Sequence, residues 1–163
     1  MGNCIFFFNT KETLDKNSSD LKSPNKQSQQ CKVFIPPITS GKVIKVYDGD
    51  TITIATKVPG LHNSEVYKFS IRLNGIDSPE LKSNNDDEKE IAKIAQTTLY
   101  DKIFDKVVTL KNVKLEKYGR LLCDVYLKEL HLNNWLLDQR LAVPYDGGTK
   151  HKPESWCKFY YNN

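Results

Sequence analysis

The sequence predicts a mainly β protein of the α+β class, built as a small closed barrel with helices packed against it. Three observations lead to this fold class: short stretches of alternating apolar residues, one long segment with helical periodicity, and their order along the chain. That order is β-β-β-α-β-β-α. A length of 163 residues with 39% hydrophobic content suits one modest domain and a tail.

The first three expected strands lie before residue 74. Apolar residues alternate with polar ones on both sides of Asp48-Gly49-Asp50, and Asp-Gly is a strong signal for a hairpin turn. A third strand is expected over Val66–Leu73. Pro79 ends this strand region because proline has no N–H to donate to a sheet.

Helical periodicity appears between Asp86 and Phe104, where apolar residues recur on one face and acidic residues gather in the first turns. Two more strands are expected over Lys106–Leu115 and Leu121–Leu127, around a turn at Tyr118-Gly119. A short helix is expected over His131–Gln139.

The amino-terminal part has a different composition. Residues 9–30 are rich in Asn, Ser, Gln and Lys and lack hydrophobic periodicity, so they cannot bury enough apolar surface to offset the entropy of ordering. We therefore expect a flexible tail over residues 1–40 and one domain over residues 41–163.

Charge and cysteine usage exclude several classes of protein. A net charge of +4, with acidic residues interspersed, permits a polyanionic partner without requiring one. No apolar run approaches the roughly 20 residues that a membrane span needs. The four cysteines lack Cys-x-x-Cys spacing, so neither a zinc site nor a disulfide framework is expected, and an intracellular setting is the default. Cys123 is expected to be an inert core thiol.

Three segments carry the side chains that phosphodiester hydrolysis requires, namely groups that neutralise phosphate charge, position a water and stabilise the leaving oxygen. Asp50, Asp77 and Glu80 lie near the ends of expected elements, and their oxygen atoms suit Ca²⁺ or Mg²⁺ better than zinc. Arg72 and Arg120 add guanidinium groups, which match phosphate geometry.

Taken singly, each of these motifs has a purely structural explanation. Asp-Gly-Asp is an ordinary turn, a lone arginine on a strand is usually a surface ion pair, and Asp-x-Pro-Glu commonly precedes a helix. The joint pattern is more specific. Asp48-Gly49-Asp50-Thr51, then the run Arg72–Glu80, then Lys117-Tyr118-Gly119-Arg120 together resemble the staphylococcal-nuclease-like, or thermonuclease, family over about Gly41–Asp146.

The resemblance implies an OB-type five-stranded barrel with a single Ca²⁺ site. The ion would be held by the carboxylates of Asp50 and Asp77 and by the backbone carbonyl of Ser78. Glu80 would lie beside the attacking water, either as general base or as the group that orients the water. Calcium would act as Lewis acid and template.

The resemblance also implies how nucleic acid is bound and cut. Arg72 and Arg120 would grip the scissile phosphate and stabilise its charge in the transition state. Lys117 and Tyr145 are candidate substrate contacts. Members of this family cut DNA and RNA with little sequence preference and leave 3′-phosphate and 5′-hydroxyl ends.

Three departures from the family pattern stand out. The stretch between Ile54 and Arg72 is longer than in the compact bacterial enzymes, so an extended loop is expected beside the site. Glu116 replaces the usual aspartate and is expected to lie apart from the chemistry. After Asp146 the chain is short for a long closing helix, and we expect Trp156 and its aromatic neighbours to stabilise this end instead.

The amino terminus, Met1-Gly2-Asn3-Cys4, resembles the start of dually acylated proteins. Gly2 would carry myristate and Cys4 palmitate, and two chains would anchor the protein stably to a membrane. Phe6 departs from the pattern, which has Ser or Thr at that position. The alternative is an unmodified apolar terminus.

Two other functions stay open at this point. Nuclease-like barrels also occur as catalytically silent modules that bind nucleic acid or protein, and a membrane-tethered adaptor is a further alternative. The usual mark of such silent forms is loss of the acids or the arginines. All of them are present in this chain, which favours the enzyme.

Overall fold

A computed structural model describes residues 32–61, 65–116 and 118–162 of the chain. Contacts between residues group Ile35–Asn163 into one compact unit. The predicted flexible segment 9–30 and the acylation candidates Gly2 and Cys4 lie outside the described residues. Both stay predictions.

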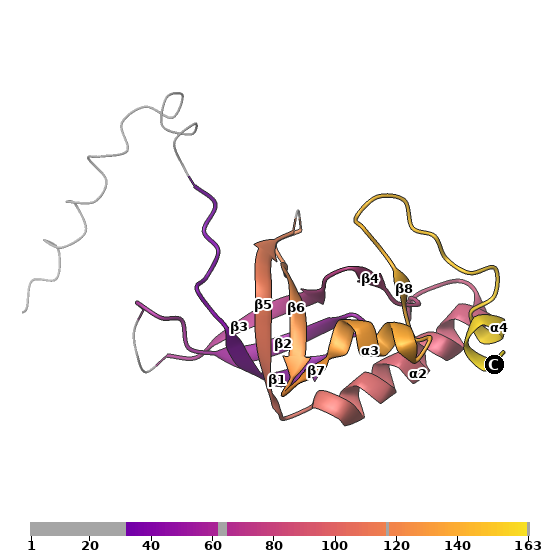
Figure 1. Cartoon of the computed structure of the whole chain (residues 1–163), viewed down its shortest axis with the longest axis horizontal. Helices are drawn as coiled ribbons and strands as arrows, with labels where there is room; N and C mark the ends of the chain where they lie inside the picture. Colours follow the sequence, from indigo (N-terminus) through magenta and orange to yellow (C-terminus); the bar gives the residue numbers. More distant parts are fainter. Residues whose placement is uncertain (1–31, 62–64, 117, 163) are drawn as a thin grey trace, which may run out of the picture. The chain divides into compact units, whose positions relative to one another are not determined.

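Five strands of the unit form a closed barrel (Figure 1). They are β1 (Ser40–Val46), β2 (Thr51–Thr56), β3 (Tyr67–Leu73), β5 (Val107–Leu115) and β6 (Leu121–Leu127). Four neighbouring pairs are antiparallel, and the parallel pairing of β3 with β6 closes the barrel. The structure therefore confirms the predicted OB-type barrel. Strands β3, β5 and β6 lie within one residue of their expected bounds, and β1 and β2 lie on either side of the predicted Asp48-Gly49-Asp50 turn.

Helices cover the barrel on one side (Figure 1). The long helix α2 (Asp86–Ile103) begins where the side chain of Asn85 accepts a hydrogen bond from the Asp87 N–H, a typical N-cap. It packs on β1, and α3 (Leu132–Asp138) packs on β6. Both helices match the sequence prediction. Among the described residues, none of the helices is long and apolar enough to cross a membrane.

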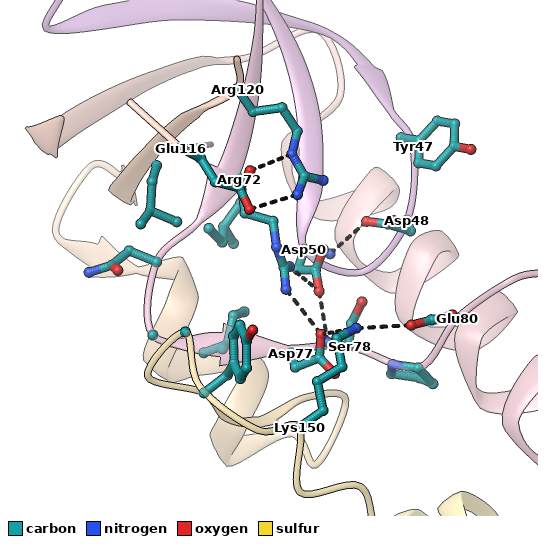
Figure 2. Close-up of a pocket in the computed structure, with 18 of the residues that line it drawn as sticks. Tyr47, Asp48, Asp50, Arg72, Asp77, Ser78, Glu80, Glu116, Arg120 and Lys150 are labelled. Atoms are coloured by element: carbon teal, nitrogen blue, oxygen red, sulfur yellow. Dashed lines mark hydrogen bonds and ion pairs between the residues drawn. The ribbon is translucent and has the colours of Figure 1, made fainter. Parts of the chain in front are cut away.

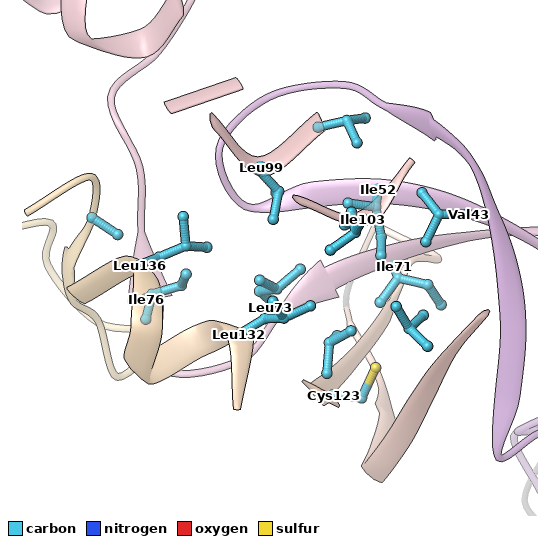
Figure 3. Close-up of a cluster of buried hydrophobic side chains, with 14 of the residues drawn as sticks. Val43, Ile52, Ile71, Leu73, Ile76, Leu99, Ile103, Cys123, Leu132 and Leu136 are labelled. Atoms are coloured by element: carbon cyan, nitrogen blue, oxygen red, sulfur yellow. The ribbon is translucent and has the colours of Figure 1, made fainter. Parts of the chain in front are cut away.

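The hydrophobic core lies between the barrel and these two helices (Figure 3). Alternate residues of β1, β2 and β3 point inward because side chains of a strand alternate between its faces. They meet one apolar face of α2 and one of α3. The fully buried members include Val43, Ile52, Ile71, Leu99, Ile103, Leu132 and Leu136. Cys123 is also buried there, and burial raises its pKa to about 12, so the thiol is inert as expected.

Three short strands and one short helix were not predicted. Strand β4 (Ile76–Asp77) pairs with β8 (Val143–Pro144), and β7 (Leu130–His131) extends the main sheet beside β6. The chain ends in α4 (Trp156–Tyr161), which packs against α2. Trp156 is only 2% exposed, which agrees with its expected part in stabilising this end.

Candidate active site

Strand pairing gathers the predicted site residues at one end of the barrel. Asp50 directly precedes β2, and Thr51 lies opposite Arg72 in the β2–β3 ladder. The parallel β3–β6 pairing places Arg72 opposite Leu122. Arg120, just before β6, is therefore brought to the same end as Asp50 and Arg72. Figure 2 shows the two arginines reaching into one space from neighbouring strands.

A close approach at Gly49 joins the first motif to the second. A Cβ atom at this position would lie 2.8 Å from Cβ of Ser78 and 2.9 Å from Cβ of Ala95, distances that a larger residue does not tolerate. Glycine thus lets the turn lie against the segment after β4. There the Ser78 N–H donates to Asp50 Oδ2 at 2.7 Å, and the Asp50 N–H donates to Asp48 Oδ1 at 3.1 Å.

Two carboxylates and a guanidinium form the buried centre of the site (Figure 2). Asp50 and Asp77 are 4% and 2% exposed. Arg72 Nη2 lies 3.0 Å from Asp77 Oδ1, and Nη1 contacts the Asp50 carboxylate. Burial lowers the pKa of Arg72, while the neighbouring carboxylates, first Asp77, partly oppose that shift. The group stays charged, because arginine is not deprotonated in proteins.

Glu80 lies at the edge of this centre and is half exposed. Lys150 Nζ is 2.9 Å from Glu80 Oε1 and 3.0 Å from Asp77 Oδ1, so one ammonium bridges the two carboxylates. The hydrogen bond from Lys150 is the main cause that lowers the pKa of Glu80. Glu80 is therefore an ionised carboxylate at neutral pH, as a general base must be.

Glu88 fixes the backbone that carries Glu80. Its buried carboxylate accepts the Glu80 N–H at 3.0 Å, the Ser83 hydroxyl at 2.7 Å and the Lys152 ammonium at 2.7 Å. Burial by itself would raise the pKa of Glu88, but the hydrogen bonds from Lys152, Ser83 and Glu80 outweigh it and lower the pKa. This role could not be predicted from the sequence, because Glu88 is one of several acids at the start of α2.

Arg120 is held by Glu116 through two hydrogen bonds. Arg120 Nε is 2.7 Å from Glu116 Oε2, and Nη2 is 2.9 Å from Oε1. Nη1 makes a longer contact of 3.5 Å to the Thr51 hydroxyl. The expectation that Glu116 lies apart from the chemistry is therefore wrong. The signal was available, since Glu116 stands four residues before Arg120 on the other side of a tight turn.

A cavity of about 840 Å³ opens over these groups. Tyr145 lines it; its N–H donates to the Gly75 carbonyl at 2.9 Å, and its hydroxyl donates to the Gly148 carbonyl at 3.3 Å. Its contact with substrate stays a prediction. Tyr47 and Tyr118 line the same cavity. Lys117 lies outside the described residues, so its contact with substrate stays a prediction.

The donor set fits a hard cation such as Ca²⁺. Asp77 Oδ2 is buried and has no hydrogen-bond partner among the described residues, and Asp50 presents a second buried carboxylate. In the described part of the chain, no three acidic, histidine or cysteine side chains converge on one point. Calcium takes 6–8 oxygen ligands, so backbone oxygen, for which Ser78 is the candidate, and water would complete its shell.

A model of the staphylococcal nuclease homologue family matches residues 70–157, more than half of the chain. The chain belongs to the staphylococcal nuclease homologue family. The matched residues include Arg72 at the end of β3, the segment from Asp77 to Glu80, and Arg120 after the Tyr118-Gly119 turn.

Curated relatives include two proteins named as endonucleases. The chain is 33% identical over 104 residues to an uncharacterized endonuclease of Haemophilus influenzae, covering 64% of this chain and 51% of that protein. It is 31% identical over 94 residues to Endonuclease Htp3 of Saprolegnia parasitica, covering 53% and 44%. It is 33% identical over 96 residues to an uncharacterized protein of Bacillus anthracis, covering 57% and 41%. The chain thus spans about half the length of these relatives.

Proposed function

We propose that this chain is a calcium-dependent nuclease that hydrolyses the phosphodiester bonds of DNA and RNA with little sequence preference. The observation that carries the proposal is one cavity where Arg72, Arg120 and Glu80 surround the buried carboxylates of Asp50 and Asp77. Membership of the nuclease family, whose members generally use Ca²⁺, supports it, as do the relatives named endonucleases.

In this proposal each group acts on the scissile phosphate or on the attacking water. Arg72 and Arg120 bind the phosphate oxygens and stabilise the charge that grows in the transition state. Glu80 accepts a proton as the water oxygen bonds to phosphorus. Asp50 and Asp77 would hold the calcium ion, which when bound would supply Lewis-acid polarisation of the phosphate. The bond from phosphorus to the 5′ oxygen breaks, and that oxygen takes up a proton from solvent water, so the products end in 3′-phosphate and 5′-hydroxyl.

The test is cleavage by the purified full chain of single-stranded DNA and RNA of one sequence, with calcium, with magnesium or with chelator. Cutting of both substrates with calcium, no cutting with chelator, and 5′-hydroxyl ends on the products are expected. A folded, calcium-loaded chain that retains oligonucleotide in a gel-shift assay without cutting it would instead identify a binding module and contradict the proposal.

We also propose that Gly2 and Cys4 are acylated and tether the nuclease to an intracellular membrane face. The support is the sequence pattern at residues 1–4 and the stable binding that two acyl chains give. Intact mass after co-expression with a myristoyltransferase tests the first step. A mass increase of one myristoyl group that Gly2→Ala abolishes is expected, and an unmodified Gly2 would contradict the tether.

A further inference from the structure

Lys150 brings a lysine ammonium into the carboxylate cluster from the carboxyl-terminal part of the chain. It follows β8 and reaches back across 70 residues of sequence to Glu80. Its Nζ lies 3.0 Å from Asp77 Oδ1 and 2.9 Å from Glu80 Oε1 (Figure 2). The contact therefore involves the same Asp77 carboxylate that the proposed calcium site needs.

The segment 146–155 that carries Lys150 is fixed at both ends. Before it, the Tyr145 N–H donates to the Gly75 carbonyl at 2.9 Å. On the carboxyl-terminal side of Lys150, Lys152 pairs with buried Glu88 at 2.7 Å, and the Trp156 N–H donates to an Asp87 carboxylate oxygen at 2.6 Å. The backbone is thus held over the site, and the position of Lys150 follows from the fold.

The Lys150 ammonium and a divalent cation are both attracted by the negative charge of the Asp77 carboxylate. The Lys150 ammonium carries a full positive charge at neutral pH and forms ion pairs with both Glu80 and Asp77. A cation bound to Asp77 would lie close to that charge and be repelled by it. The side chain of Lys150 is 41% exposed, and its flexible four-carbon chain allows the ammonium to leave.

We propose that Lys150 is a built-in counter-ion of the cation site, which calcium must displace from Asp77, so that Lys150 sets the calcium concentration at which the site fills. The inference rests on the proposed function only for the calcium site itself. It assigns to Lys150 a role in metal affinity that is separate from the roles of Arg72 and Arg120 on the phosphate.

Isothermal titration of calcium into the chelator-stripped full chain tests this role directly. Lys150→Met removes the charge and keeps most of the side-chain volume, whereas Lys150→Arg keeps the charge. Lys42→Met is the matched control, because Lys42 forms an exposed ion pair with Asp105 at 2.7 Å and does not line the cavity. Melting curves in chelator verify that each variant is folded.

The calcium dissociation constant of Lys150→Met is expected to fall on the order of tenfold, the scale on which one adjacent unit charge shifts a carboxylate equilibrium. Lys150→Arg and Lys42→Met should stay within about twofold of the wild type. An unchanged or weaker affinity in folded Lys150→Met would overturn the inference. Absence of calcium binding in every variant would overturn it together with the metal site. Calcium binding without nucleic-acid cutting would contradict the proposed nuclease alone.

Discussion

The Arg120 side chain is held by Glu116 in a position from which it can bind a phosphate. Glu116 accepts hydrogen bonds from Nε and Nη2 of the Arg120 guanidinium. The third nitrogen, Nη1, lies near the Thr51 hydroxyl at the end of the barrel. A guanidinium fixed in this way loses less entropy when it binds substrate. Glu116 is thus a positioning residue that acts through Arg120.

The first prediction separates these two roles. Arg120→Ala should lower kcat/KM on a single-stranded oligonucleotide by at least about 10²-fold, because a phosphate donor is lost. Glu116→Ala should lower it roughly tenfold, since the guanidinium is retained but less well placed. The double variant should match Arg120→Ala, because Glu116 has nothing else to position. Additive losses in this double-mutant cycle would show that Glu116 acts independently of Arg120.

The sequence could reveal only some of these residues. Asp50, Asp77, Glu80 and the two arginines stand in short motifs at strand ends, where a single stretch of sequence displays both the element and the chemistry. Glu88 and Lys150 both act by contacting Glu80. Glu88 stands 8 positions after Glu80 in the sequence, and Lys150 stands 70 positions after it. Acidic residues in the first turn of a helix and lysines in loops are common on protein surfaces. The sequence around Glu88 and Lys150 therefore does not distinguish these two residues from ordinary surface residues.

At the scale of elements, the Asp87 carboxylate joins the start of α2 to the start of α4. Asp87 accepts hydrogen bonds from the Ser155 hydroxyl at 2.8 Å and from the backbone N–H groups of Trp156 and Cys157 at 2.6 and 3.2 Å. These bonds, first that of Ser155, lower the pKa of Asp87 below its ordinary value. This attachment holds the carboxyl-terminal segment that brings Lys150 to the site.

The second prediction concerns the pH dependence of this attachment. A carboxyl group with a lowered pKa in the folded state contributes stability above its unfolded pKa, about 3.9, and loses it as pH falls through the folded pKa. Asp87→Asn should therefore lower the melting temperature at pH 7, and the difference from wild type should shrink as the pH falls below about 4. A difference that stays constant from pH 7 to pH 3 would show that the charge of Asp87 is not the cause.

The elements themselves were largely predictable because each long strand and helix carries its own periodicity. The two-residue strands β4, β7 and β8 were not, since pairs such as Ile76–Asp77 with Val143–Pro144 exist only because the chain folds back on itself. Helix α4 has six residues, too few to show a helical period. Its position depends on the burial of Trp156 and on the bonds to Asp87.

At the scale of the whole molecule, folding of the barrel places two acidic groups, 27 positions apart in the sequence, in one buried place. Asp50 and Asp77 are both buried and share Arg72 as their main countercharge. Because the two carboxylates come together only in the folded barrel, a cation that binds both stabilises the folded state over the unfolded chain.

The third prediction follows from this linkage. Calcium at about 100 times its dissociation constant should stabilise the chain by about 2.7 kcal/mol, which corresponds to a rise in melting temperature of about 10 °C for a unit of this size. Asp77→Asn, compared with wild type in chelator to verify its fold, should lose most of the rise. An equal rise in this variant would place the ion elsewhere in the molecule.

The central claim is that this cavity hydrolyses phosphodiesters. Its most direct test is kcat/KM for cleavage of a labelled single-stranded oligonucleotide by wild type and by Glu80→Gln. Both proteins are purified identically and assayed at saturating calcium. Glu80→Gln conserves the shape of the side chain but cannot accept the proton, so a fall of at least about 10²-fold is expected. Equal cleavage by the two proteins would contradict the account, since the activity would then come from outside this site.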